Sequence, residues 1–403
     1  MKILKSHKYR LYPSKVQIQK LEQQFGACRW VYNWGLETKI REYEKAKKEI
    51  SCFDLNKRLT VLKQREETKW LREANSQALQ DALRNLDSAF TSFFRKKNRF
   101  PKFKSKKSKQ SFSVPQHINI NFETNRLYIG KFNEGIRGFF HREFKGKIKK
   151  ATISKTCSEK YFVSVLIETS DEYPEKPRPK EDKSIGLDLG LTHFCTLSTG
   201  EKIDNPKFLN KLSKKLKREQ RRLSKKKKGS KNREKQRLVL SRVYEKIQNQ
   251  RNDFLHKLSR RLVDEKQVDT ICLESLDIKQ MLKNHWLSRN ISDSSWSIFI
   301  SMLKYKCDWC GKNILFIGKF EPSSKLCTCG YLNQNLKLQD RKWICPNCGT
   351  KHDRDILAAN NIKHFAFHKQ NLIRTDCTEF TPVETRISKV GSLNQEDPQF
   401  IVG

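Results

Sequence analysis

Residues 184–200 read SIGLDLGLTHFCTLSTG, and the fold assignment of this chain starts from them. The stretch predicts two short apolar strands joined by a tight glycine turn, with Asp188 inside the first strand. A carboxylate in an apolar strand is costly unless something compensates its charge, and a bound cation is the usual compensation. Asp188 is therefore a candidate metal ligand, although a lone aspartate on a strand is more often a turn or edge residue.

Two further carboxylates occupy comparable positions. Glu274 ends a second apolar strand, over residues 268–273. Asp355 opens a predicted helix whose alanine and isoleucine side chains recur at helical spacing on the face of Asp355. If that face packs on the sheet, Asp355 points to the sheet as well, whereas Asp353 is expected to cap the helix.

Asp188, Glu274 and Asp355 together have the composition of a nuclease site. Three carboxylates can hold two divalent ions, and hard oxygen ligands favour Mg²⁺ or Mn²⁺. Each residue also has a structural alternative: an edge residue, a solvated strand end and a helix cap. The order and the contexts of the three are more specific than any of them alone.

Half of the 12 cysteines lie between Cys307 and Cys348. Two knuckles, one with Cys327 and Cys329 and one with Cys345 and Cys348, predict a structural Zn²⁺ site with four thiolates. The first knuckle is one residue shorter than the usual C-x-x-C. Cys307 and Cys310 form a rival knuckle with the usual spacing, so a ligand set that includes them stays open.

Charge indicates the class of partner. The 403 residues include 84 Lys and Arg against 44 Asp and Glu, a formal net charge of +40. Such an excess implies a polyanion, foremost nucleic acid, although a ribosome-like or merely soluble basic protein is the alternative. The segment KLSKKLKREQRRLSKKKKGSKNREK, residues 211–235, predicts a basic helical hairpin, which is either a rail for phosphates or a solvated coil.

No window approaches the roughly 18 consecutive apolar residues of a membrane-spanning helix, and the basic N-terminus lacks the apolar region of a secretory signal. We therefore expect no membrane partner and a cytoplasmic, nucleoid-associated location.

The chain resembles the TnpB family, the transposon-encoded relatives of type V CRISPR effectors. The resemblance covers nearly the whole chain and is carried by motifs in the family's order, namely RWVYNWGLE near Arg29, FFRKKNRFPKFKSKKSKQSF, GLDLGL at Asp188, LESLDIK at Glu274, YKCDWCGK, PSSKLCTCG, RKWICPNCGTKHDRDILAANNI and VETRISKVGSLNQE. Asp188, Glu274 and Asp355 match the family's catalytic positions.

The resemblance implies a multidomain α/β protein with a RuvC-like, RNase H-type nuclease domain that carries a zinc-ribbon insertion, together with a β-barrel wedge domain and a helical recognition domain. Together with the shifts in composition, it predicts the following boundaries: wedge 1–12 and 112–178, recognition 13–111, nuclease 184–320 and 350–368, zinc-binding insertion 321–349, and a mobile tail 369–403.

The activity that the resemblance implies is RNA-guided, magnesium-dependent endonuclease cleavage of double-stranded DNA beside a short element-specific motif. The partners would be a transposon-derived guide RNA and target DNA, bound by a monomer. A catalytically silent RNA-guided regulator is the first alternative, and the intact carboxylates argue against it. A transposase that joins strands itself is the second, and only an assay of its products distinguishes joining from cutting.

Overall fold

The computed structural model describes residues 2–47, 49–319, 321–337 and 339–368. The chain forms two compact units, Lys2–Glu172 and the part that begins at Tyr173. The predicted tail over residues 369–403 lies outside the described residues. None of the helices in the described part of the chain has the length and apolar character needed to span a membrane.

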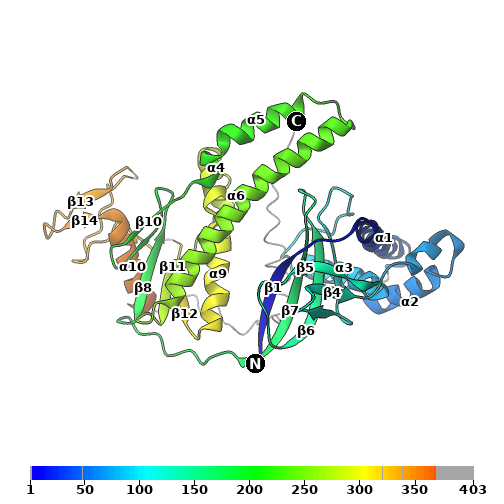
Figure 1. Ribbon diagram of the computed structural model, residues 1–403. Helices are drawn as coiled ribbons and strands as arrows, with labels where there is room; N and C mark the ends of the chain where they lie inside the picture. Colours follow the sequence, from blue (N-terminus) through cyan, green and yellow to red (C-terminus); the bar gives the residue numbers. More distant parts are fainter. Residues whose placement is uncertain (1, 48, 320, 338, 369–403) are drawn as a thin grey trace. The chain divides into compact units, whose positions relative to one another are not determined.

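The first unit is built on an antiparallel sheet of seven strands in the order β2-β6-β7-β1-β5-β4-β3. Figure 1 labels β1, β4, β5, β6 and β7 of this sheet. Its strands are β1 (Lys2–Leu11), β2 (Gln110–Val114), β3 (Asn119–Asn121), β4 (Arg126–Ile129), β5 (Phe132–Phe139), β6 (Lys147–Lys155) and β7 (Tyr161–Glu172). The first strand lies in the middle of the sheet because it pairs with β7 on one side and β5 on the other. The predicted joining of an N-terminal strand to the later strands is therefore present.

This sheet is open in its hydrogen bonding, whereas the resemblance implies a closed barrel. The short strands β2 and β3 stand at the two ends of the strand order and do not pair with each other within the described residues. Helices α1 and α3 pack beside β2. Neighbouring helices thus cover the region of this end strand, in place of strand pairing around a barrel.

The helices of this unit follow β1 directly. They are α1 (Lys15–Ala46), α2 (Cys52–Leu62), the 3₁₀ helix η1 (Glu66–Arg72) and α3 (Ser76–Phe94). Helix α1 starts at a capping box in which Ser14 and Gln17 satisfy each other's backbone N–H groups. One hydrophobic core contains Leu21 and Leu83 of the helices together with Val165 of the sheet. Helices and strands of this unit thus share a single core.

The second unit contains a mixed sheet of five strands in the order β10-β9-β8-β11-β12. The strands are β8 (Ser184–Leu189), β9 (His193–Leu197), β10 (Lys202–Asp204), β11 (Thr270–Glu274) and β12 (Asn313–Ile317). The pairs β8–β9 and β9–β10 are antiparallel, whereas β8–β11 and β11–β12 are parallel. The strands predicted around Asp188 and Glu274 are therefore direct neighbours.

The helices of this unit are α4 (Phe208–Lys211), α5 (Ser213–Ser224), α6 (Lys231–Asp264), α7 (Ile278–Met281), α8 (His285–Ser294), α9 (Trp296–Trp309) and α10 (Arg354–His368). Helices α6 and α9 pack on one face of the sheet, and α10 packs on the other. Ile185 and Leu187 share one core with residues of α6 and α9, whereas Cys272 packs with Ile362 and Phe365 of α10. Because side chains alternate along a strand, these contacts define which residues face α10.

A small hairpin precedes the last helix. Its strands are β13 (Lys342–Ile344) and β14 (Lys351–Asp353), which pair antiparallel. Among the described residues, their core cluster consists of Cys327, Leu336, Trp343, Cys345 and Leu357. A core of this size cannot by itself hold a segment folded, which is the setting in which proteins use a structural metal.

Candidate active site and nucleic-acid interface

Asp188 and Glu274 lie side by side although 86 positions separate them in the chain. The parallel register of β8 and β11 pairs Leu187 with Leu273, so Asp188 and Glu274 occupy the next step of the same ladder. Since Leu187 and Leu273 point to the core shared with α6 and α9, the two carboxylates point to the opposite face. That face is the one covered by α10.

Helix α10 brings Asp355 to the same place. The helix packs on β8 very closely, because a Cβ at Gly186 would collide with the carbonyl oxygen of Ala359. Asp355 lies one turn before Ala359, and Asp188 lies two residues after Gly186 on the same strand face. Asp355 therefore faces Asp188, and Gly186 is needed for this close approach.

Electrostatics show that the three carboxylates interact. The pKa of Asp188 is raised to about 7, first by burial and then by the negative charges of Asp355 and Glu274. Burial also raises the pKa of Glu274. Two adjacent arginines oppose the effect at Asp188 without cancelling it. A crowded group of carboxylates is suited to binding a divalent cation, and its oxygen ligands fit Mg²⁺ or Mn²⁺.

Asp353 does not belong to this group. Its carboxylate accepts hydrogen bonds from the backbone N–H groups of Asp355 and Ile356, at 3.2 and 3.3 Å, and so caps α10. It also accepts a 2.7 Å hydrogen bond from Lys202. The predicted capping of the helix by Asp353 is thus present.

Arg341 is a candidate site residue that sequence reasoning missed. Its guanidinium lies 3.4 Å from the carboxylate of Asp355 and 3.4 Å from the hydroxyl of Thr192. The hairpin sets this position, because Arg341 immediately precedes β13 and its carbonyl accepts a hydrogen bond from the Arg354 N–H. A lone arginine among 84 basic residues has no local pattern that would have identified it.

The four predicted zinc ligands lie together. The ligand atoms of Cys327, Cys329, Cys345 and Cys348 are all within 4.8 Å of one another, with 3.6 Å between Cys327 and Cys348 and between Cys329 and Cys345. A tetrahedral site with Zn–S bonds of about 2.3 Å requires sulfur–sulfur distances of about 3.8 Å. The four thiols therefore fit one Zn²⁺ ion, in spite of the short first knuckle.

Hydrogen bonds and burial shift the pKa values of two of these thiols in opposite directions. The Tyr331 backbone N–H and the Asn347 side chain lower the pKa of Cys329 to about 6, whereas burial raises the pKa of Cys327 to about 11. His352 Nε2 lies 3.0 Å from the Cys327 sulfur. His352 is buried and packs against Trp343, so it holds Cys327 from outside the four-cysteine group. The sequence pattern did not single out His352 as a residue of the zinc site.

The rival knuckle lies elsewhere. Cys307 is fully buried at the end of α9 in the core that α9 shares with α6 and the sheet, and Cys310 follows at the helix end. Within the described residues, neither joins the group of four thiols. Burial raises the pKa of Cys307 to about 12, which disfavours the thiolate that a metal requires.

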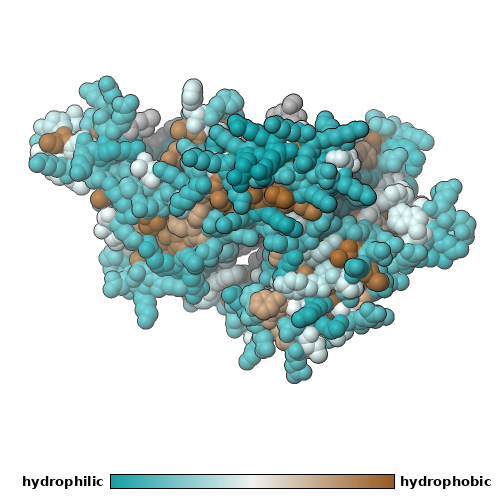
Figure 2. Space-filling view, turned by 45° about the horizontal axis from the view of Figure 1, so that its top comes forward, coloured by the Kyte–Doolittle hydropathy of each residue, from teal (hydrophilic) through white to brown (hydrophobic). Residues whose placement is uncertain are grey.

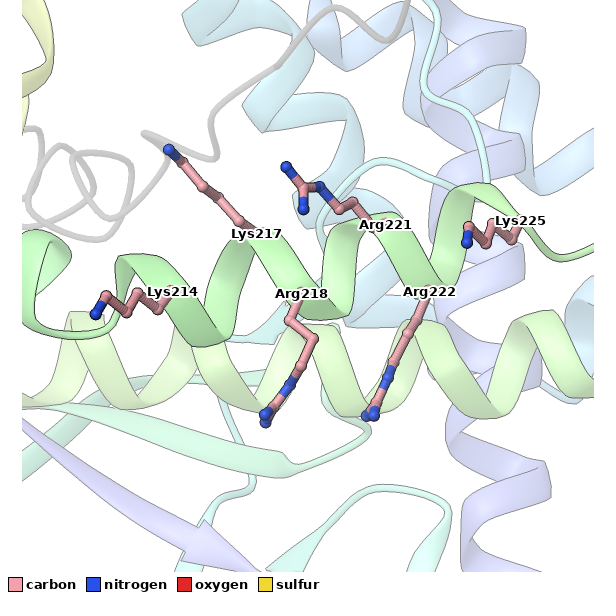
Figure 3. A pocket seen from close by; sticks show the side chains of 6 residues that line it. All are labelled: Lys214, Lys217, Arg218, Arg221, Arg222 and Lys225. Carbon is pink, nitrogen blue, oxygen red and sulfur yellow. The ribbon is translucent and has the colours of Figure 1, made fainter.

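Helices α5 and α6 pair as the predicted basic hairpin. Five basic residues of α5 and Lys225, which follows the helix, line an open groove of about 420 Å³. The five are Lys214, Lys217, Arg218, Arg221 and Arg222. Figure 2 shows long hydrophilic side chains gathered over this hairpin, and Figure 3 shows Lys217 and Arg221 on one side of α5 and Arg218 and Arg222 on the other. The hairpin thus presents exposed basic side chains on both sides of α5.

A buried carboxylate orders part of that surface. Glu219 accepts hydrogen bonds from Arg222 and Arg218, at 3.2 and 3.1 Å, and from Gln236 of α6 at 2.8 Å. Glu219 is only 3% exposed, whereas both arginines are more than half exposed. The carboxylate of Glu219 therefore holds the guanidinium groups of Arg218 and Arg222 in place, while both side chains stay largely exposed to solvent.

The first unit carries its own groove, of about 690 Å³, along α1. Trp30 and Trp70 meet edge to face in its lining, with ring centroids 5.8 Å apart. Arg29, Asn33 and Gln23 supply polar groups beside these rings. Flat aromatic surface next to hydrogen-bonding groups is suited to an unstacked nucleobase.

Comparison with known proteins gives the class of fold first. Three family models match the chain, "Helix-turn-helix domain" (OrfB_IS605) over residues 1–48, "Probable transposase" (OrfB_IS605) over 163–285, and "Cas12f1-like, TNB domain" over 296–362. A solved Cas12f1–sgRNA–target DNA complex aligns with 90% of this chain and 99% of its own chain, with a TM-score of 0.56 at 14% identity. The chain therefore has the mixed α/β fold of a compact Cas12f1-like protein.

Curated relatives give the family. A protein of Streptomyces pristinaespiralis named "Putative RNA-guided DNA endonuclease" is 39% identical over 363 residues, 89% of either chain. One of Escherichia coli K12 named "Putative RNA-guided DNA endonuclease InsQ" is 31% identical over 377 residues, 90% of this chain and 92% of its own. The chain belongs to the TnpB family.

Proposed function

We propose that this protein is an RNA-guided DNA endonuclease of a transposable element, which hydrolyses double-stranded DNA next to a short element-specific motif. The observation that carries this proposal is the convergence of Asp188, Glu274 and Asp355 on one face of the mixed sheet. We assign this sheet and α10 to an RNase H-like, RuvC-type nuclease domain. The activity in the names of its relatives agrees with the assignment.

In this mechanism the three carboxylates would bind metal ions and orient them. Asp188, Glu274 and Asp355 would hold two Mg²⁺ or Mn²⁺ ions, which when bound supply an activated water and stabilise the leaving oxygen of the phosphodiester. Asp188 lies on β8 and pairs with Thr196 of β9. Burial and then repulsion by the neighbouring carboxylates raise its pKa, and a bound cation would offset both effects.

Arg341 would bind the scissile phosphate. Its guanidinium is half exposed and already lies within 3.4 Å of Asp355. A guanidinium can pair with two phosphate oxygens at once, so it orients the phosphate relative to the carboxylates. Arg341 immediately precedes β13, so we assign the four-cysteine segment, with structural Zn²⁺, the task of positioning this arginine.

Nucleic-acid binding would be divided among basic surfaces. The α5–α6 hairpin would contact the phosphates of the guide RNA and the RNA–DNA hybrid by charge and shape, which leaves sequence choice to base pairing. The groove with Trp30 and Trp70 in the first unit, which contains the proposed wedge and recognition segments, would contact unpaired bases. We propose that one protein molecule acts with one RNA, in association with the nucleoid.

The first experiment identifies the guide. The protein is expressed together with its native flanking DNA, and the RNA that copurifies is sequenced. We expect one RNA species with a constant structured part and a variable end, and Mg²⁺-dependent cutting of plasmid DNA that matches the variable end. Binding without cutting would favour the silent regulator, joined products would favour the transposase, and random RNA would contradict guidance.

The hairpin surface gives a quantitative prediction. The double variant Lys217→Gln/Arg221→Gln removes two exposed charges from the groove. The salt dependence of guide RNA binding should fall by about 1.4–1.8 units of log K per log salt, since each lost phosphate contact removes about 0.7–0.9. Filter binding at a series of KCl concentrations measures this slope.

The matched control is Lys257→Gln/Arg260→Gln, which removes the same charge from α6. In α6, Lys257 forms an ion pair with Asp253, and Arg260 forms one with Asp264. This control should keep the wild-type slope. Equal slopes for both double variants would contradict the assignment of the groove to phosphate binding.

A further inference from the structure

A second cluster of metal-ligating side chains lies at the other end of α10. Glu181, His364 and His368 each offer a ligand atom, and these three atoms lie within 4.8 Å of one another. The two histidines are one helical turn apart, so both side chains project from the same face of α10. Glu181 approaches from the segment that precedes β8.

The distances are those of ligands around an ion. Glu181 Oε1 lies 3.6 Å from His364 Nδ1, and Glu181 Oε2 lies 3.6 Å from His368 Nδ1. Both exceed the roughly 2.7–3.2 Å of a hydrogen bond. A tetrahedral ion with ligand bonds of about 2.0–2.1 Å separates its ligands by about 3.3–3.4 Å. Because His368 Nδ1 also lies 3.1 Å from the His364 carbonyl oxygen and the two imidazoles stack, coordination requires the exposed rings to turn about their side-chain torsions until a free ring nitrogen of each points at the ion.

The backbone holds both sides of the cluster. The Glu181 carbonyl accepts hydrogen bonds from the Ser184 N–H and hydroxyl, at 3.2 and 2.7 Å, which forms a turn directly before β8. His368 Nδ1 lies 3.1 Å from the His364 carbonyl oxygen, and the two imidazoles stack with centroids 4.1 Å apart. All three ligands thus come from ordered backbone, while their side chains stay accessible to a metal ion from solvent.

This cluster is separate from both sites described above. His364 is nine residues beyond Asp355 on α10, which corresponds to about 13 Å along the helix. None of its three residues belongs to the four-cysteine group. Two imidazoles with one carboxylate are a ligand set for Zn²⁺, Ni²⁺ or Co²⁺, whereas Mg²⁺ prefers oxygen ligands alone.

We propose that Glu181, His364 and His368 form a further binding site for a divalent transition-metal ion. The ion fastens the turn before β8 to the C-terminal half of α10. Because β8 carries Asp188 and α10 carries Asp355, it joins the two elements that hold the candidate catalytic carboxylates. The site requires neither guide RNA nor DNA, so its test does not depend on the proposed endonuclease activity.

Nickel calorimetry tests the site. Full-length protein without a polyhistidine tag, with zinc already in the four-cysteine site and in excess Mg²⁺, is titrated with Ni²⁺. We expect one nickel site in the wild type, and affinity at least about 10-fold weaker in each of His364→Ala, His368→Ala and Glu181→Gln. All three side chains are more than a third exposed, so the substitutions should leave folding intact.

The matched control is His285→Ala, which removes an exposed histidine from α8 and should bind nickel as the wild type does. Trypsin provides a second readout, since Lys180 and Lys183 flank Glu181. Nickel should slow cleavage after these lysines in the wild type but not in His368→Ala. Identical isotherms for the wild type and the His364→Ala and His368→Ala variants, or undiminished binding in Glu181→Gln, would overturn the proposal.

Discussion

Asp188→Asn should lower guided DNA cleavage by at least about 10³-fold while binding of RNA and DNA persists. Asparagine keeps the shape of the side chain but removes the negative charge that would hold a divalent ion beside Glu274 and Asp355. A single-turnover assay with saturating RNA measures the rate, and gel shifts measure binding. Glu274→Gln should behave in the same way.

Asp204→Asn is the matched control, because Asp204 lies on the same sheet at the edge strand β10 and its side chain is 92% exposed. It should cut at the wild-type rate. Cutting by Asp188→Asn within tenfold of wild type would refute the catalytic assignment. Loss of nucleic-acid binding in that variant would instead indicate a structural role for Asp188.

Asp188→Asn should also stabilise the metal-free protein. Asp188 has a pKa of about 7 in the folded protein against an ordinary value of 3.8. Between these values the folded state binds more protons than the unfolded state, so the free energy of unfolding falls as pH rises to about 7. Asparagine, which is always neutral, avoids this loss.

Urea unfolding without Mg²⁺ should show Asp188→Asn more stable than wild type by about 1–3 kcal/mol at pH 8, and by less at pH 5. Added Mg²⁺ should stabilise the wild type and not the variant. Opposite effects on activity and stability would mark Asp188 as a residue placed for cation binding. A variant less stable than wild type at pH 8 would count against this interpretation.

Cys345→Ser should remove one equivalent of zinc and lower cleavage by at least about 100-fold while the α5–α6 hairpin still binds RNA. Cys345 is fully buried within a core cluster of five residues, so the segment depends on the metal rather than on apolar packing. When it unfolds, Arg341 loses its place beside Asp355. Elemental analysis measures the zinc content, circular dichroism measures the unfolding of the segment, and the cleavage assay measures the rate of cutting.

Cys310→Ser is the matched control for this experiment. Cys310 lies at the end of α9 outside the four-cysteine group, so its substitution should leave zinc content and cleavage unchanged. Zinc loss in Cys310→Ser with full zinc in Cys345→Ser would restore the rival ligand set. Unchanged cleavage in a zinc-free Cys345→Ser would contradict the positioning of Arg341 by this segment.

Local patterns predicted much of this molecule because they depend on near neighbours in the chain. The basic hairpin follows from the run of Lys and Arg over residues 211–235, and the capping role of Asp353 follows from its place two residues before Asp355. Closure of the expected barrel is not shown by the strand pairing of the described residues, since closure depends on whether the distant end strands β2 and β3 meet. No local pattern contains that information.

By itself, the sequence determined the family, the charge of the binding surface and the individual settings of Asp188, Glu274, Asp355 and the four cysteines, because each rests on short-range spacing. Only the tertiary structure decided which groups meet. Parallel pairing of β8 with β11 aligns Asp188 with Glu274, the β13–β14 hairpin brings Arg341 to Asp355, and α10 carries His364 to Glu181. Each of these contacts joins residues of different strands, helices or loops. Such contacts are determined by how whole helices and strands pack.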